Sequence, residues 1–74
     1  MNRIVITHCP LETNKDEVFA MAKPDEKLID AIKMHSKKEV GEGIETFEQK
    51  DNIIATEKGY YCAFFESDLQ HSNF

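Results

Sequence analysis

The segment from Pro24 to Lys38, PDEKLIDAIKMHSKK, constrains the fold most, because it has the clearest hydrophobic period in the chain. On a helical wheel of about 100° per residue, one side of this segment carries Leu28, Ile29, Ala31, Ile32 and His35. The other side is charged, Pro24 suits a first helical turn, and Gly41 can end the helix in a left-handed conformation. The pattern predicts an amphipathic helix of about four turns, whose apolar side must be buried by the rest of the chain.

Length and charge narrow the class of protein. Seventy-four residues form one domain, and at 41% hydrophobic content its core is thin. The 14 acidic and 9 basic residues give a net charge of -5, which repels phosphate backbones and favours a protein partner with a basic or mixed surface. No apolar run approaches the roughly 20 residues that cross a bilayer, and residues 1–12 lack a signal peptide's long apolar region. We therefore expect a cytoplasmic protein with reduced cysteines and no membrane partner.

Four further stretches indicate strands and turns. Residues 2–8, NRIVITH, alternate in polarity and are rich in branched side chains, which is typical of a strand. Residues 44–49, 52–56 and 60–66 form three more strand patterns, separated by turn residues at 50–52 and by Glu57-Lys58-Gly59. These three predict an antiparallel meander after the helix. The last residues, 67–74, are polar and predict a loosely ordered tail behind a compact domain of residues 1–66.

The segment from Glu17 to Lys23, EVFAMAK, fits two structures. As a strand it alternates small and large apolar residues, and as a helix it can begin near Thr13, with Asp16 as a weak capping partner. We favour the strand, because the residue before a proline prefers an extended backbone. The predicted fold is therefore an α+β two-layer sandwich, with one amphipathic helix on an antiparallel sheet in the order ββαβββ. The alternative order is βααβββ.

The strand YYCAFF, residues 60–65, concentrates aromatic side chains. Alternation places Tyr61 and Phe65 on one face and Tyr60, Cys62 and Phe64 on the other. Because a single helix covers only one face of a sheet, the second face is either covered by the tail or the N-terminal loop, or it is an interface with a partner or a second copy. The same aromatics could stack nucleic-acid bases, but acidic residues rather than lysines or arginines surround them.

We interpret this second face as the candidate partner-binding site. It comprises three aromatic residues and an acidic rim, namely Tyr61, Phe65, Phe47, Glu42, Glu45, Glu48, Asp51 and Glu57. The aromatics would supply affinity and the acidic residues would set the encounter rate. The competing interpretation of the acidic residues is a solvated face without a partner. A homodimer through the aromatic face is a further possibility.

The residues that carry catalysis and metal binding in other proteins do not form a recognisable pattern here. Cys9 and Cys62 could serve a small cysteine-dependent enzyme only if folding brought a histidine beside one of them, since His8 and Cys9 point to opposite faces of a strand. His35 and His71 are isolated, so we assign no metal ligand, no cofactor and no catalytic residue. The glycines form no nucleotide-binding motif. A nucleic-acid-binding module is the second alternative.

In size and composition the chain is similar to small acidic proteins encoded by phages and plasmids, which bind and block a host machine; anti-CRISPR proteins are among them. This likeness covers no specific motif. It implies a stoichiometric inhibitor or adaptor that occludes a partner, rather than an enzyme.

Overall fold

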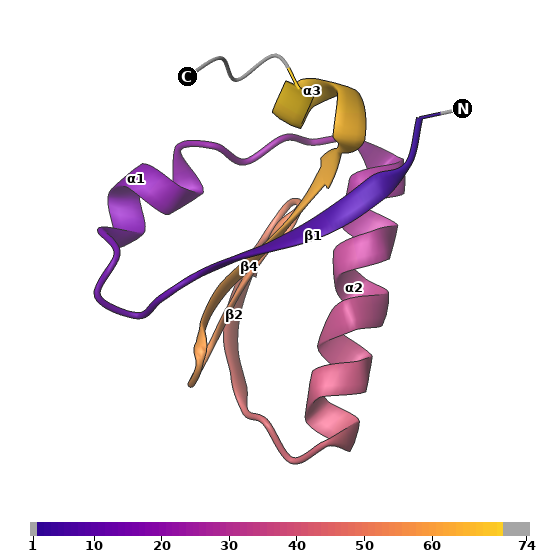
Figure 1. The fold of residues 1–74 in the computed structure, drawn as a ribbon. Coiled ribbons are helices and arrows are strands. Elements are labelled where there is room, and N and C mark those ends of the chain that lie inside the picture. Colours follow the sequence, from indigo (N-terminus) through magenta and orange to yellow (C-terminus); the bar gives the residue numbers. More distant parts are fainter. Residues whose placement is uncertain (1, 71–74) are drawn as a thin grey trace.

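A computed structural model describes residues 2–70 and has an α+β fold, in which one long helix packs against a four-stranded antiparallel sheet (Figure 1). The strand order in the sheet is β1-β4-β3-β2. The elements are β1 Ile4–Cys9, α1 Lys15–Phe19, α2 Glu26–Gly41, β2 Thr46–Lys50, β3 Ile53–Thr56, β4 Gly59–Phe65 and α3 Glu66–Gln70. The predicted fold class is confirmed, but the element order follows the alternative, βααβββ, with a short third helix added.

Helix α2 forms as its period predicts, although its ends differ in detail. The Asp25 side chain caps the helix by accepting hydrogen bonds from the N–H groups of Lys27 and Leu28 at 2.9 and 3.2 Å. Pro24 therefore precedes the cap instead of forming the first turn. At the other end the left-handed residue is Gly43, with φ of 85°, and not Gly41, which is still helical.

The strand predicted for Glu17–Lys23 is wrong, because a local cap starts helix α1 instead. The Asn14 side chain accepts hydrogen bonds from the N–H groups of Asp16 and Glu17 at 2.9 and 3.3 Å. The short helix then buries Val18 and Phe19, the two apolar residues within it. Lys23, which precedes Pro24, lies in the linker after this helix, so the proline does not conflict with α1.

Both faces of strand β4 are covered, since α1 and α2 lie on opposite sides of the sheet (Figure 1). On the α2 side, Leu28 and Ile32 pack with Ile54 and Ala63 of the sheet, and Tyr61 and Phe65 lie against this cluster. On the α1 side, the buried cluster is Val18, Phe19, Ile53, Ala55, Tyr60 and Cys62. The prediction that Tyr61 and Phe65 lie on the face away from the long helix is therefore wrong, because alternation along the strand places them under it.

The C-terminal part of the described chain is more ordered than expected. Residues 66–70 form helix α3, where a loose tail was predicted from residue 67. The Arg3 and Glu66 side chains pair, the Ser67 N–H donates to Asn2 Oδ1 at 3.1 Å, and Lys23 pairs with Asp68 at 3.0 Å. These contacts tie α3 to the N-terminus and to the linker between α1 and α2. The rest of the predicted tail lies outside the described residues.

Candidate protein-binding surface

Four glutamates gather at one end of the molecule, where α2 ends, β2 begins and β3 turns into β4. The Glu57 N–H donates to the Glu45 carbonyl at 3.1 Å, and the Glu45 N–H donates to Glu57 Oε1 at 3.2 Å. The Ile44 N–H donates to the Glu39 carbonyl at 2.9 Å, and Glu42 caps α2 between them. We call Glu39, Glu42, Glu45 and Glu57 the acidic end. The residues are separated in sequence, and the return of the chain at both turns brings them together.

The acidic end has a negative field that reaches the sheet. The C-terminus of α2 adds the negative pole of its dipole to these carboxylates. The pKa of Tyr61 is raised above its ordinary value, first by burial of the hydroxyl and then by the charges of Glu39 and Glu42. Because burial is the larger cause, the carboxylates make the smaller contribution to the raised pKa, but their field extends to β4. A cationic group of a partner would be attracted to this end.

The predicted acidic rim is not one continuous surface. Glu42, Glu45 and Glu57 belong to the acidic end, whereas Glu48 forms an ion pair with Lys15 of α1 at 2.8 Å. The hydrogen bond and charge of Glu48 raise the pKa of Lys15. Asp51 lies in the β2–β3 turn, after the opposite end of β2, with φ of 50°. Glu48 and Asp51 therefore lie outside the acidic end and are not part of its cluster of carboxylates.

Of the three aromatics assigned to the partner-binding site, only Phe47 is exposed. This residue is 60% accessible, and it occupies an irregularity in β2 where the register with β3 shifts between Thr46 and Glu48. Thr46 pairs with Thr56, the residue before Glu57, so Phe47 lies close to the acidic end. Val40, near the end of α2, is also 55% accessible. Tyr61 and Phe65 are half-buried instead, against α2.

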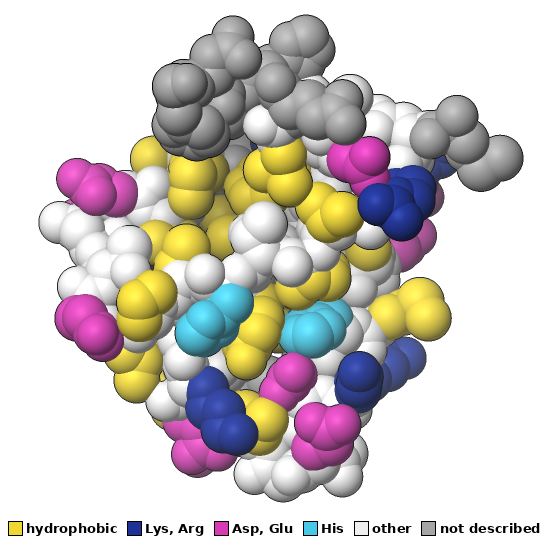
Figure 2. Space-filling view, viewed as in Figure 1, with side chains coloured by type: hydrophobic (Ala, Val, Ile, Leu, Met, Phe, Trp, Pro, Cys, Tyr) yellow, Lys and Arg dark blue, Asp and Glu magenta, His cyan; other side chains and the backbone are white. Residues whose placement is uncertain are grey.

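A row of aromatic and polar side chains joins β1, β4 and α2, although little in the sequence indicates it. The ring centroids of His8 and His35 each lie 4.8 Å from that of Tyr61. His35 Nε2 lies 3.2 Å from Glu39 Oε1, while Glu39 Oε2 is buried without a hydrogen-bond partner among the described residues. Figure 2 shows two histidine side chains on this face of the molecule, with hydrophobic surface between them. The only signal in the sequence was the i,i+4 spacing of His35 and Glu39.

The cysteines give little support to a cysteine-dependent enzyme. Cys62 is fully buried, and burial raises the pKa of its thiol to about 11, so at neutral pH it is protonated and a poor nucleophile. This agrees with its interpretation as a small apolar core residue. Cys9 is half-buried and, like Cys62, is a free thiol. Within residues 2–70, no group of three or more histidine, cysteine or acidic side chains is placed to hold a metal ion.

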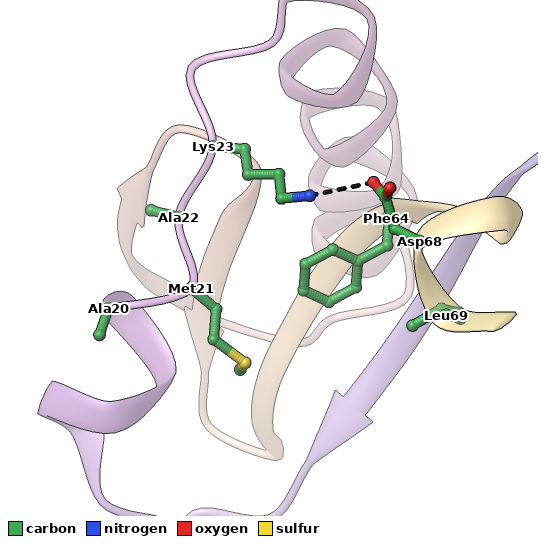
Figure 3. Close-up of a pocket in the computed structure, with 7 residues that line it drawn as sticks. All are labelled: Ala20, Met21, Ala22, Lys23, Phe64, Asp68 and Leu69. Atoms are coloured by element: carbon green, nitrogen blue, oxygen red, sulfur yellow. Dashed lines mark hydrogen bonds and ion pairs between the residues drawn. The ribbon is translucent and has the colours of Figure 1, made fainter. Parts of the chain in front are cut away.

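A pocket of about 400 Å³ lies between the linker after α1, strand β4 and helix α3. Met21 and Phe64 point into it, and the ion pair between Lys23 and Asp68 crosses one side (Figure 3). Ala20, Ala22 and Leu69 complete the lining. Among the described residues that line the pocket, Lys23 and Asp68 are the charged ones, and the remaining walls are apolar.

Comparison with known proteins finds no matching family model, no matching curated protein and no matching solved structure. In the described part of the chain, no helix has the length and apolar character required to cross a membrane. The function must therefore be argued from the surface itself.

Proposed function

We propose that this protein binds another protein stoichiometrically and acts as an inhibitor or adaptor by occluding a basic or mixed surface of that partner. The observation that carries the proposal is the acidic end with exposed apolar side chains beside it. Phe47 and Val40 are 60% and 55% accessible, and each lies two residues along the chain from a glutamate of the acidic end, Glu45 and Glu42 respectively. A charged border around an accessible aromatic residue is the arrangement expected of a protein interface.

The two kinds of residue would contribute in different ways. The carboxylates and the C-terminus of α2 attract a cationic partner from a distance and increase the association rate, an effect that falls with ionic strength. Burial of Phe47 on the partner would slow dissociation, because aromatic anchors supply much of the affinity of an interface. The other aromatics of the predicted site, Tyr61 and Phe65, would act indirectly by holding α2 on the sheet.

The setting we propose is cytoplasmic, and the biological role is that of the phage-encoded anti-defence or anti-CRISPR proteins. The net charge of -5 supports a basic protein partner over nucleic acid. The two free cysteines are compatible with a reducing compartment. A homodimer through the aromatic faces of β4 has little support, since helices cover both faces.

The proposal can be tested by comparing which partner proteins the wild type and its variants capture from a host lysate. Phe47→Ala and Glu42→Gln/Glu45→Gln should each lose a stoichiometric partner, while Glu12→Gln/Asp30→Asn should retain it. The control pair changes the net charge equally, and both of its residues are exposed and outside the acidic end. If all three variants capture the same partner as the wild type at 150 mM salt, about the physiological ionic strength, the proposed surface is wrong.

A further inference from the structure

The two edges of the sheet differ in how well they are protected against pairing with another strand. Strand β2 has an irregular register and carries Glu48 and Lys50, features that block strand addition. Strand β1, IVITHC, lies at the other edge and pairs with β4 in unbroken register over its six residues. It contains no proline, lysine or acidic residue. An edge of this kind is a template for a further strand.

The hydrogen bonds of β1 show which backbone groups are free. The Glu66 N–H donates to the Arg3 carbonyl at 2.7 Å, which makes Arg3 and Glu66 a hydrogen-bonded pair in an antiparallel ladder. Such pairs alternate along the strands, so Val5, Thr7 and Cys9 direct their backbone groups to β4. Ala63 lies opposite Ile6, and its N–H donates to the Asn52 carbonyl at 2.9 Å. The Ala63 N–H therefore points away from β1 toward β3, as this alternation requires. The N–H and C=O groups of Ile4, Ile6 and His8 therefore point to the open edge.

The side chains of the same three residues lie on the α2 side of the sheet. Ile4 and Ile6 are 36% and 38% accessible because α2 does not fully cover β1. Strand β1 is in front of β4 in Figure 1, and Figure 2, from the same direction, shows hydrophobic side chains gathered over this region. The open backbone groups and the partly exposed isoleucines form one strip, which we call the β1 edge.

We propose that the β1 edge pairs with the β1 edge of a second copy, in antiparallel orientation about a two-fold axis through Ile6. In this register Ile6 lies opposite Ile6, and Ile4 of each copy lies opposite His8 of the other. All the outward N–H and C=O groups of these three residues find partners, and the two sheets become one continuous sheet of eight strands. The isoleucines that each copy leaves partly exposed are then covered across the junction.

The charges near β1 are compatible with pairing between two copies of this chain, and they favour an antiparallel arrangement of the two β1 strands. Residues 4–9 contain no lysine, arginine or acidic residue, so two chains of net charge -5 can meet here without opposing like charges directly. Arg3, which pairs with Glu66 of its own chain, is the charged residue next to the strand. Parallel pairing in register would place the Arg3 residues of the two copies side by side, whereas in the antiparallel register Arg3 lies opposite the uncharged Cys9. Phe47, the exposed aromatic residue of the proposed binding surface, lies on β2 at the other edge of the sheet, so this inference does not depend on the proposed function.

Light scattering at several concentrations tests the proposal. The wild type should have twice the monomer mass, and Ile6→Lys should have the monomer mass, because an edge lysine opposes strand pairing. Gln49→Lys is the matched control: it places the same charge at an exposed site on the other edge strand and should remain dimeric. A monomeric wild type at millimolar concentration would overturn the proposal, as would a dimer that Gln49→Lys disrupts or that Ile6→Lys leaves intact.

Amide hydrogen exchange of the wild type provides a test that needs no variant. The outward N–H groups of Ile4, Ile6 and His8 should gain protection of at least tenfold as the protein is concentrated, while those of Phe47 and Gln49 should not. Exchange of the three β1 amides that does not depend on concentration would overturn the proposal, even if the protein were dimeric.

Discussion

The buried side chain of Asn52 accepts a hydrogen bond from the backbone N–H of Lys23 at 2.8 Å. The same side chain donates to the carbonyl of Ala63, also at 2.8 Å. One amide group at the start of β3 therefore holds the linker between the two helices against the centre of the sheet. This contact joins the parts of the chain that cover opposite faces of β4.

Asn52→Ala should lower the free energy of unfolding by about 2–4 kcal/mol, because it leaves two backbone groups without their partner in a buried site. Urea denaturation measures this change. Gln49→Ala is the control, since Gln49 is exposed and its side chain makes one surface hydrogen bond, to the Asp51 carbonyl. The control should differ from the wild type by less than about 0.5 kcal/mol. Equal effects of the two substitutions would contradict the role of Asn52.

Substitution of Gly59 and Gly41 by alanine should change the stability of the protein in opposite directions. Gly59 has φ of 128°, and an added Cβ would meet the Cys9 carbonyl and the His8 imidazole, so Gly59→Ala should cost at least about 2 kcal/mol. Gly41 is helical with open space around it, so Gly41→Ala should stabilise the protein by up to about 1 kcal/mol. Thermal unfolding of both variants checks the pair. A Gly59→Ala protein that melts with the wild type would show that the β3–β4 turn is not constrained as described.

Stability should fall in the alkaline range because of Cys62. Burial raises the pKa of this thiol from 9.0 to about 11, so the native state holds its proton more tightly than the unfolded chain. The resulting stabilisation is complete below pH 9 and is lost as the pH rises toward 11, with a slope of about 1.4 kcal/mol per pH unit. The raised pKa of Tyr61 acts in the same direction. Urea midpoints measured between pH 8 and 11 should fall less steeply for Cys62→Ala than for the wild type, and parallel curves would exclude Cys62 as the cause.

The sequence predicts those features that rest on local periodicity. Helix α2, the three-strand meander and the burial of Cys62 follow from apolar spacing within each segment. Helix α1 was missed because it has five residues, too few for a period, and its start depends on one capping contact of Asn14. The covered faces of β4 depend on where α1 packs, which no local pattern encodes.

The candidate site was predicted only in part, for the same reason. Glu42, Glu45 and Glu57 come together through two turns, whereas Glu48 pairs with Lys15, a residue distant in sequence. The approach of His8 and His35 to Tyr61 involves three separate elements. Pairing of that kind is set by tertiary packing and by the register of β1 with β4.

The most direct test of the central claim compares two sets of aromatic substitutions in the same urea denaturation experiment. If Tyr61 and Phe65 hold α2 on the sheet and Phe47 is the exposed anchor, Tyr61→Ala/Phe65→Ala should lose several kcal/mol, about 3 or more, or fail to fold. Phe47→Ala should stay within about 1 kcal/mol of the wild type and lose only partner capture. A Tyr61→Ala/Phe65→Ala protein that keeps wild-type stability but loses its partner would contradict the claim and place the binding surface on β4.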